Sequence, residues 1–405
     1  MVEAGSAMFI FTAVVVLLAA VVLLVKNRLI PVKQVTITVN QQRSLEVTSG
    51  DRLLWTLAEA GIYLPAACGG RGSCGQCRLF VNSGAGPMLP TERNHISSRA
   101  AARGERLACM VTVQDDLAIS VPPDILEARR LTCTVKRTRY LTPFLKEITL
   151  AVPDDEQLEY DAGDYLLLEA PAGTIRFADF CVPAEYQGDW SHLRELNVTI
   201  ETPTVRAYSL ASYPGEQGVF KLVVRIATPP HNAPPDTPPG RVSSYIFSLE
   251  EGAGVPISGP FGTFHIRDTE REMIFIGGGA GIAPMRSMIL DLLQRQGSKR
   301  KISFWYGARS QREVCYRNEF EALAKTHENF TYRVALSEPA PDGGWQGLTG
   351  FIHQSVYQAY LSNHPAPEEA EYYLCGPPLM SSAVVGMLED LGVDRDSILF
   401  DDFGT

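Results

Sequence analysis

The sequence predicts a multidomain fold with an apolar N-terminal helix, a small sheet-and-helix domain, a β barrel or sandwich, and a doubly wound α/β domain. Residues 8–25 carry no charged side chain. Residues 133–265 hold short β-type runs broken by Pro and Gly, whereas strand, Gly-rich turn and helix alternate from Met273 onward. A chain of 405 residues with 45% apolar content also exceeds what one hydrophobic core usually supports. Two or three compact domains are therefore expected.

The net charge and the cysteine content argue against two broad classes of protein. A formal net charge of −10, without a basic stripe, argues against nucleic acid as a partner, because phosphate binding needs clustered Lys and Arg. Eight cysteines in a chain of this length do not make a small disulfide scaffold. Their uneven clustering indicates metal ligation in a reducing compartment.

The N-terminal apolar segment has the length of one membrane-spanning helix. Residues 8–25 number eighteen, and Thr12 supplies their only polar side-chain group. A cleaved signal peptide is the competing interpretation, but the leader contains the acidic Glu3 and no small-residue cleavage site follows. Basic residues come directly after the segment, at Lys26, Arg28 and Lys33. Their position favours a membrane anchor with the bulk of the protein on the cytoplasmic side.

A small sheet with a helix packed on it is expected next along the chain. Residues 32–53 alternate apolar and polar side chains about a polar turn, which is typical of a β-hairpin. Residues 53–62, with the sequence LLWTLAEAGI, predict a short helix.

Four cysteines in this region have the spacing of an iron–sulfur centre. Cys68, Cys74 and Cys77 share one Gly-rich loop, with five and two intervening residues, and Cys109 follows at a distance. Four thiolates satisfy a [2Fe–2S] cluster, and backbone N–H groups of such a loop stabilise its sulfurs. Structural zinc is the alternative, although its ligands usually come as two short Cys pairs. The arrangement resembles that of plant-type ferredoxins and favours the cluster. Three isolated cysteines are expected to be small buried hydrophobic residues: Cys133, Cys181 and Cys315.

Two motifs in the β-rich part resemble the flavin-binding signature of the ferredoxin–NADP reductase superfamily. The first is RAYS at residues 206–209, and the second is GRVSSY at residues 240–245, which opens a predicted helix. Serine at a helix start also caps helices without any ligand. The resemblance implies that Arg206 pairs with the flavin pyrophosphate, that Tyr208 packs on the isoalloxazine ring and that Ser209 reaches the ring. It further implies phosphate binding at the helix N-terminus, by Gly240, Val242, Ser243 and Ser244.

Two motifs in the C-terminal part predict a nicotinamide site. A Gly-rich turn between an apolar strand and a helix brings backbone N–H groups and a helix dipole to a pyrophosphate; its glycines are Gly277, Gly278, Gly279 and Gly281. A later strand ends in CGPP, which resembles the superfamily's second nicotinamide motif and is formed by Cys375, Gly376, Pro377 and Pro378. In that superfamily the cysteine lies near the hydride path and is not a covalent nucleophile.

The terminal segment FDDFGT contains, third from its end, an aromatic residue of the kind that the superfamily uses against the flavin ring. Phe403 is expected to cover the ring until nicotinamide displaces it, and a frayed tail is the alternative. Ser209, Cys375 and Phe403 are therefore the expected catalytic residues.

The order of these modules resembles the F subunit of the Na⁺-translocating NADH:quinone oxidoreductases along nearly the whole chain. Specific motifs are EYQGDW, RAYSLASYP, SSYIFSL, SGPFGTF, IGGGAGIAPMRS, KISFWYGARS and TGFIH. Three features depart from the family pattern: Ser212 stands where asparagine is expected, Cys315 is unexpected, and the loop PMLPTERNHIS (residues 87–97) is looser. None of them falls on a ligand position, so the departures concern partner contacts more than chemistry.

The resemblance implies four parts of the chain. They are a single N-terminal transmembrane helix with a linker (residues 1–33), a β-grasp [2Fe–2S] ferredoxin domain (34–126), a six-stranded antiparallel FAD barrel (127–267) and a Rossmann-like NADH domain (268–405). FAD is preferred over FMN because of Arg206 with the serines at 243 and 244. The resemblance implies NADH as the electron donor. NADPH stays an alternative donor, because Arg309 and Ser310 follow the predicted strand ISFWYG.

The function implied is electron input to a respiratory complex. NADH delivers a hydride to FAD, and single electrons pass to the cluster, then to other membrane subunits and quinone, coupled to Na⁺ export. The expected location is the bacterial inner membrane, single-pass, with the soluble domains in the cytoplasm. A reductase component of a multicomponent oxygenase is the main alternative, although such reductases need no membrane span. A non-enzymatic membrane ferredoxin is the other.

Overall fold

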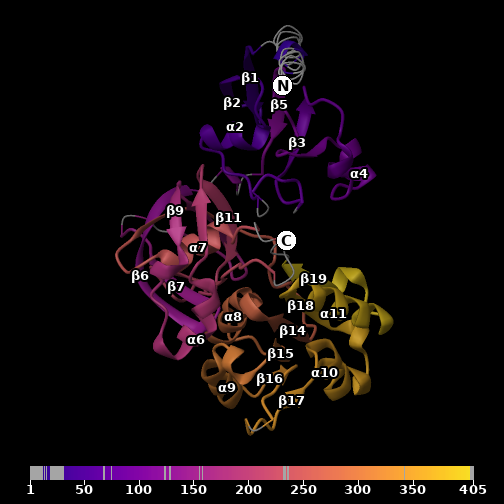
Figure 1. Cartoon of the computed structure of the whole chain (residues 1–405). Coiled ribbons are helices and arrows are strands. Elements are labelled where there is room, and N and C mark those ends of the chain that lie inside the picture. The colour runs from indigo at the N-terminus through magenta and orange to yellow at the C-terminus, as the bar shows by residue number, and fades with distance from the viewer. Residues whose placement is uncertain are drawn as a thin grey trace. The chain divides into compact units, whose positions relative to one another are not determined.

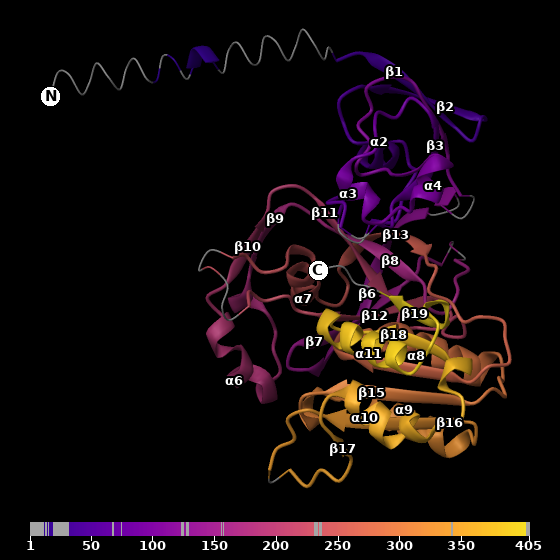
Figure 2. The same cartoon turned by 90° about the vertical axis from the view of Figure 1, so that its right-hand side faces the viewer.

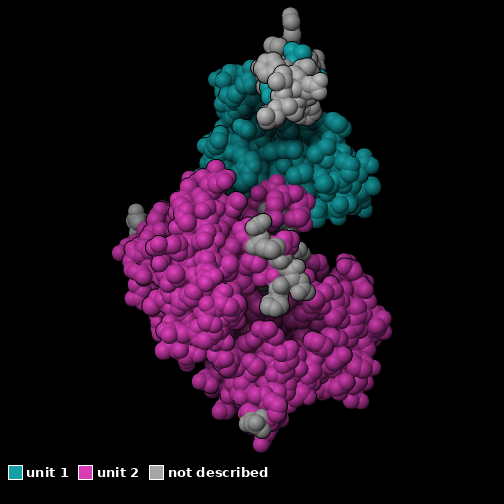
Figure 3. Space-filling model, viewed as in Figure 1, with its two compact units in different colours: residues 1–64, 77–126 teal, residues 65–76, 127–405 magenta. Residues whose placement is uncertain are grey.

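The chain, drawn as a cartoon in Figure 1, is divided into two compact units, which Figure 3 shows in different colours. The computed structural model describes residues 12, 14, 16–18, 32–66, 69–73, 75–122, 125–126, 129–154, 156, 158–230, 234, 237–341 and 343–401. Unit 1 comprises residues 1–64 and 77–126, and unit 2 comprises residues 65–76 and 127–405.

The expected membrane anchor, residues 8–25, lies largely outside the described residues. Residues 12, 14 and 16–18 are described, and they are helical. No helix among the described residues combines the length and the apolarity that a membrane crossing requires.

Unit 1 is built on a five-stranded mixed sheet with the strand order β2-β1-β5-β3-β4. Its strands are β1 (Gln34–Val39), β2 (Arg43–Thr48), β3 (Arg78–Ser83), β4 (Glu105–Leu107) and β5 (Leu117–Ser120), and its helices are α2 (Leu53–Glu59), α3 (Pro90–Arg93) and α4 (Ser98–Ala102). Strand β1 pairs parallel with β5, and the other neighbours are antiparallel. The predicted hairpin is β1 with β2, the predicted helix is α2, and both predictions are confirmed.

Alternation of apolar and polar residues explains the core of unit 1. In β1 the side chains of Val35, Ile37 and Val39 are buried and those between them are not, because successive side chains of a strand point to opposite faces. Leu53 and Leu57, one helical turn apart in α2, are also fully buried.

The first part of unit 2 is an antiparallel barrel with the strand order β11-β8-β13-β6-β7-β12. The strands are β6 (Arg129–Thr142), β7 (Leu145–Ala151), β8 (Tyr165–Ala170), β11 (Thr204–Ser209), β12 (Val219–Arg225) and β13 (Gly254–Phe261), and the helix α7 (Arg241–Ser248) accompanies them. A bridge between Leu210 and Leu222 connects the two ends of this order. The prediction of an antiparallel barrel is confirmed.

An insertion between β8 and β11 corrects one cysteine prediction. It contains the hairpin of β9 (Gly173–Arg176) and β10 (Asn197–Ile200), with α6 (Gln187–Trp190) between them. Cys181 lies in this insertion and is exposed, because its neighbours Phe180 and Val182 occupy the buried positions. The prediction was therefore wrong for Cys181. It is confirmed for Cys133 in the barrel core and Cys315 in the C-terminal core, and burial raises the pKa of both thiols to about 12.

The second part of unit 2 is a parallel sheet with the strand order β17-β16-β15-β14-β18-β19. Its strands are β14 (Met273–Gly278), β15 (Ile302–Ala308), β16 (Phe330–Leu336), β17 (Leu348–Thr349), β18 (Glu371–Cys375) and β19 (Ile398–Asp401), and its helices are α8 (Ile282–Leu290), α9 (Arg317–Thr326), α10 (Ile352–Ala359) and α11 (Pro378–Asp390). The first strand of this sheet lies in its middle. The doubly wound prediction is confirmed.

Both faces of this sheet are buried, which explains its continuous apolar strands. Phe275 of β14 belongs to a core that includes α8 and α9, whereas its neighbour Ile276 belongs to a core that includes α10 and α11. Figures 1 and 2 show the helices on the two sides of the strands. The apolar run that predicted β14 therefore forms a central strand of the sheet, and both of its faces are buried.

A buried arginine joins the barrel to the parallel sheet. Arg286, in α8, is 4% exposed. Its guanidinium donates two hydrogen bonds to Glu319 of α9, both 2.8 Å long, and two to Glu216, of 3.0 and 3.2 Å. It also donates to the carbonyl of Ala211, at 2.6 Å. Glu216 and Ala211 lie between the barrel strands β11 and β12, so Arg286 links the two parts of unit 2.

Two neighbouring contacts reinforce this link. The side chain of Ser287 donates to the carbonyl of Ser212 at 2.6 Å, and the hydroxyl of Ser212 accepts the N–H of Lys221 at 3.1 Å. Serine at 212, where the family pattern has asparagine, is thus fully buried and satisfied. Tyr316 packs its ring 5.2 Å from the guanidinium of Arg286.

Replacing Arg286 with methionine should destabilise unit 2 by about 3–5 kcal/mol, since the change leaves two carboxylates without their shared partner. Urea unfolding followed by tryptophan fluorescence measures this loss. The matched control is Arg395→Ala, which breaks an exposed pair with Glu389 and should cost less than about 1 kcal/mol. Equal costs for the two variants would contradict a joining role for Arg286.

Candidate active site

The candidate nicotinamide motifs meet at the carboxyl ends of β14 and β18. These adjacent strands run on to helices on opposite faces of the sheet, so a crevice opens between their ends, where α/β sheets bind ligands. Gly277 and Gly278 finish β14, Gly279 begins the short turn that leads into α8, and Cys375 finishes β18 in register with Gly277. The fold thus brings together two motifs that lie almost a hundred residues apart.

Glycine is required at position 281 by the close approach of these two motifs. A Cβ there would lie 2.0 Å from the carbonyl oxygen of Cys375 and 2.8 Å from the nitrogen of Gly376. Any side chain would therefore push the CGPP segment away from the start of α8. This constraint explains one glycine of the turn by packing, independently of any ligand.

The barrel contributes a serine to the same place. The hydroxyl of Ser209, at the end of β11, donates to the Oδ2 atom of Asp401 at 2.6 Å. Asp401 ends β19 and is in register with Cys375 of the neighbouring strand β18. Ser209, Cys375 and Asp401 therefore mark one point where the barrel meets the parallel sheet. Both Ser209 and Cys375 are buried.

Asp401 is a site residue that the sequence patterns did not reveal. Its partner Ser209 is 192 residues away, and no local motif announces the pair. The available signal was its position at the end of the last apolar strand. Phe403, the third expected catalytic residue, lies outside the described residues.

The candidate flavin residues occupy β11 and the start of α7. Arg206 and Tyr208 are half-buried in β11, and burial raises the pKa of the Tyr208 phenol. Gly240 precedes α7, and the hydroxyl of Ser243 donates back to its carbonyl at 3.1 Å. Val242 is buried beside them.

One hydroxyl at the start of α7 fits a phosphate. The Oγ atom of Ser244 is buried and has no hydrogen-bond partner among the described residues. A buried hydroxyl without a partner costs free energy, and a helix N-terminus offers backbone N–H groups to an anion. The helix α7 has eight residues, so its dipole also favours negative charge here. Ser244 therefore fits the pyrophosphate of a flavin dinucleotide.

The candidate cluster ligands are described in part. Cys68 and Cys74 lie outside the described residues. Cys77 directly precedes β3, Cys109 lies two residues after β4, and both are buried. The N–H of Ala108 donates to the carbonyl of Cys77 at 2.8 Å, so the antiparallel pair of strands brings these two cysteine segments together. Buried thiols on adjacent segments fit a thiolate-bound cluster.

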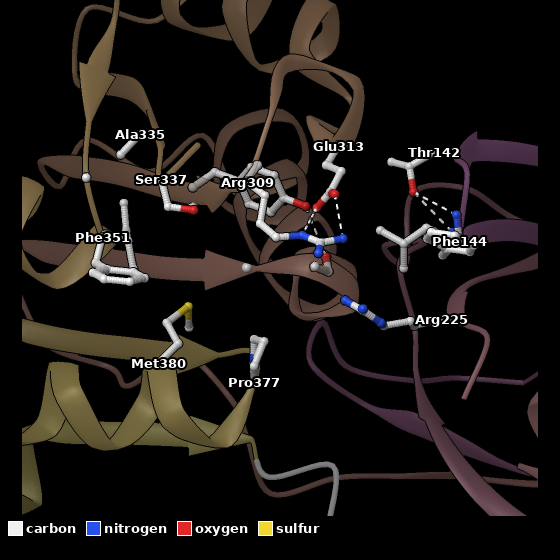
Figure 4. A pocket seen from close by; sticks show the side chains of 18 residues that line it. Thr142, Phe144, Arg225, Arg309, Glu313, Ala335, Ser337, Phe351, Pro377 and Met380 are labelled. Atoms are coloured by element: carbon white, nitrogen blue, oxygen red, sulfur yellow. Dashed lines mark hydrogen bonds and ion pairs between the residues drawn. The ribbon is translucent and has the colours of Figure 1, made fainter. Parts of the chain in front are cut away.

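A cavity of about 320 Å³ opens at the carboxyl ends of β14, β15 and β16. Figure 4 shows Arg309, Ser337 and Phe351 on its sheet side, with Pro377 and Met380 from the CGPP side. Its other wall is formed by the barrel, with Thr142, Phe144 and Arg225. Phe351 is 63% exposed and offers a flat ring of the kind that stacks on a base.

An ion pair lies at the β15 end of this cavity. The Arg309 guanidinium donates to Glu313 at 2.8 and 3.3 Å, as the dashed lines in Figure 4 show. The hydrogen bond to Glu313 raises the pKa of Arg309. Arginine after the second strand of such a sheet suits a 2′-phosphate, whereas a carboxylate suits a ribose 2′-hydroxyl. Here the carboxylate engages the guanidinium, which favours a nucleotide without the extra phosphate.

Family models match three consecutive parts of the chain. They are the 2Fe-2S iron-sulfur cluster binding domain over residues 37–114, the oxidoreductase FAD-binding domain over residues 191–266 and the oxidoreductase NAD-binding domain over residues 275–386. With the geometry above, they define an oxidoreductase that uses FAD, a [2Fe–2S] cluster and NADH.

Relatives of high sequence identity show to which family of these oxidoreductases the chain belongs. The chain is 51% identical over 396 residues to the F subunit of the Na(+)-translocating NADH-quinone reductase of Neisseria meningitidis, covering 97% of this chain and 98% of the relative. The corresponding protein of Actinobacillus succinogenes is 50% identical over 398 residues, covering 97% of each chain. The chain therefore belongs to the family of F subunits of the Na(+)-translocating NADH-quinone reductases, and the resemblance of its motifs is confirmed.

One solved structure supports the arrangement of the modules. The ferredoxin reductase in carbazole 1,9a-dioxygenase is 27% identical, with a TM-score of 0.60, and the match covers 92% of this chain and 99% of that one. The three-module layout is thus shared with an oxygenase reductase, although the relatives with about 50% identity make that alternative function the weaker one.

Replacing Ser244 with alanine should weaken FAD binding about 10- to 100-fold, because the flavin phosphate loses a charge-assisted hydrogen bond of about 1.5–3 kcal/mol. The FAD-free form should be no less stable than before, since the hydroxyl has no partner among the described residues. Equilibrium dialysis and thermal unfolding of the FAD-free chain measure the two quantities. The control is Ser248→Ala, at the other end of the same helix. A stability loss with unchanged FAD binding would contradict the assignment.

Replacing Glu313 with glutamine should raise kcat/KM for NADPH about tenfold relative to NADH, because Arg309 becomes available to the 2′-phosphate. Steady-state rates with a two-electron dye measure the ratio. The double variant Glu313→Gln with Arg309→Ala should lose the gain, and Glu321→Gln, from the exposed pair with Arg317, should show none. A gain that persists without Arg309 would rule out this explanation.

Proposed function

We propose that this chain is the NADH-oxidising, electron-input subunit of a membrane-bound Na⁺-translocating NADH:quinone reductase. The observation that carries the proposal is the meeting of Ser209, Cys375 and Asp401 where the barrel joins the parallel sheet. Together with the cysteine segments of unit 1, it gives one chain both a hydride-accepting site and a one-electron site. The names and the high identity of the relatives support the same role.

NADH binds along the cavity at the sheet's carboxyl edge. Its adenosine half lies toward β15 and β16, where Phe351 stacks on the base and Glu313 selects against a 2′-phosphate. Its pyrophosphate lies over the Gly-rich turn, where the start of α8 presents backbone N–H groups. The nicotinamide then reaches the buried end of β18, beside Cys375.

The pair of Ser209 and Asp401 orients the reacting groups. Asp401 holds the Ser209 hydroxyl in one direction, and Asp401 is only half-buried, so the pair connects the buried site to solvent. A proton on the Ser209 Oγ atom can therefore be exchanged through the Asp401 carboxylate. Phe403 follows Asp401 by two residues and serves as the removable cover of the flavin ring.

FAD is held by Arg206 and Tyr208 of β11 and by the start of α7, where Gly240, Val242, Ser243 and Ser244 receive its pyrophosphate. Bound FAD supplies the chemistry that accepts a hydride and returns single electrons. The cluster is held by Cys68, Cys74, Cys77 and Cys109.

Residues 8–25 act as a single-pass anchor in the bacterial inner membrane, with the soluble domains on the cytoplasmic side. Their apolar composition and the basic residues after them support this topology. We also propose domain boundaries between residues 126 and 127 and between residues 267 and 268.

Other subunits of the complex receive the electrons and reduce quinone. They also carry Na⁺, because residues 8–25 offer only the Thr12 hydroxyl as a side-chain oxygen.

Two variants should separate the two halves of the reaction. Cys77→Ala should abolish the [2Fe–2S] EPR signal and leave NADH reduction of FAD unchanged, because the lost thiolate belongs to unit 1 and not to the FAD and NADH parts of unit 2. Asp401→Asn should keep the EPR signal and slow FAD reduction by roughly a hundredfold, because the Ser209 hydroxyl that orients the reacting groups is no longer held in one direction. Stopped-flow absorbance and EPR of the purified chain measure both.

The control for Asp401 is Glu389→Gln, whose carboxylate belongs to the exposed pair with Arg395. It should alter neither signal. Fast FAD reduction in Asp401→Asn, or a normal cluster in Cys77→Ala, would count against the proposed division of roles.

A further inference from the structure

The loop between β3 and α4, residues 84–97, is organised by a buried ion pair. It contains the PMLPTERNHIS segment that departs from the family pattern. The Glu92 side chain is 0% exposed and the Arg106 side chain is 10% exposed. Two parallel bonds join them: Arg106 Nε to Glu92 Oε1 at 2.8 Å, and Arg106 Nη2 to Glu92 Oε2 at 2.9 Å. The loop is therefore tied to β4 by a charged fork.

Both charges of this pair have further hydrogen-bond partners. Glu92 accepts the N–H of Leu89 at 2.9 Å and that of Leu107 at 3.1 Å. Arg106 donates through Nη1 to the carbonyl of Gly86 at 2.8 Å. Although burial alone raises the pKa of Glu92, the bonds from Arg106 and from the two N–H groups hold it below its ordinary value. The pair is thus ionised, and its net charge is zero.

The loop that contains Glu92 is bonded to both described cysteine segments, to one of them through Glu92 itself. Leu107, whose N–H donates to Glu92, lies two residues before Cys109 and pairs with Arg78 in the β3–β4 ladder. Arg78 directly follows Cys77, and its guanidinium donates to the carbonyl of His95 in the loop at 2.6 Å. The loop therefore bridges the segments that carry two of the four cluster ligands.

We propose that the Glu92–Arg106 pair is a positioning device whose charge balance sets the reduction potential of the iron–sulfur centre. The inference rests on the proposed ligand set. Reduction adds one negative charge to such a centre, and nearby buried charges act strongly because little water screens them. Arg106 alone favours the reduced state and Glu92 alone opposes it. Together they cancel while fixing the two ligand segments.

Redox titrations of the purified chain, followed by EPR, test the proposal. Glu92→Gln keeps the shape and leaves Arg106 uncompensated, so the midpoint potential of the centre should rise. Arg106→Gln leaves Glu92 uncompensated, so the potential should fall. Each shift should correspond to at least a tenfold change in the equilibrium constant, which is about 59 mV for one electron. The double variant should return toward the original potential.

Two controls separate charge from shape. Arg106→Lys keeps the charge and breaks the fork, so its potential should stay near the original even if stability falls. Asp115→Asn breaks an exposed pair with Lys33 in the same unit and should leave the potential unchanged.

Shifts of the same sign in both single variants, or none, overturn the proposal. So does loss of the centre from every variant of the pair, which would leave Glu92 and Arg106 a purely structural role. An unmodified chain that shows no [2Fe–2S] EPR signal after chemical reduction would instead contradict the proposed function itself.

Discussion

The geometry of the candidate active site depends on one buried guanidinium. Arg286 is the point where α8, α9 and the loop between β11 and β12 are held together, through Glu319 and Glu216. That loop continues directly from the end of β11, where Ser209 lies. Because Arg286 fixes the barrel against the parallel sheet, Ser209 can meet Asp401 and lie beside the end of β18. The reacting groups come from two parts of unit 2, and neither part alone forms the site.

Each unit contains a buried arginine, paired with carboxylate side chains, that fixes the position of functional residues. Removing charge from water costs several kcal/mol, and only saturated hydrogen bonding offsets that cost. Arg286 in unit 2 and Arg106 in unit 1 both meet this condition, with carboxylate and carbonyl partners around the guanidinium. Apolar packing could stabilise either unit equally well. A planar charged fork adds a defined direction, which hydride transfer and ligand placement both need.

Much of the fold was predictable because local patterns carry it. The alternation in β1, the polar turn between β1 and β2 and the Gly-rich turn after β14 each follow from a short stretch of sequence. The cluster cysteines and the RAYS, GRVSSY and CGPP motifs were predictable for the same reason, although their roles as ligands stay predictions. Contacts across the chain were not. The sequence around Arg286 does not indicate its partners, because Glu216 and Glu319 lie 70 and 33 residues away along the chain. Asp401 and Glu92 lie in the segments FDDFGT and PMLPTERNHIS, but nothing in those segments indicates the distant partners of either carboxylate. Cys181 was misjudged because burial in an irregular insertion depends on its neighbours.

The central claim is that one chain accepts a hydride from NADH and also holds a one-electron site. The electrons of the hydride reach that site one at a time. An anaerobic NADH titration of the purified chain, followed at once by visible absorbance and EPR, tests it most directly. The chain should take up one electron beyond the two that a flavin holds, and the [2Fe–2S] EPR signal should grow as the flavin absorbance bleaches. Uptake that stops at two electrons, with flavin bleached and no EPR signal, would contradict the account.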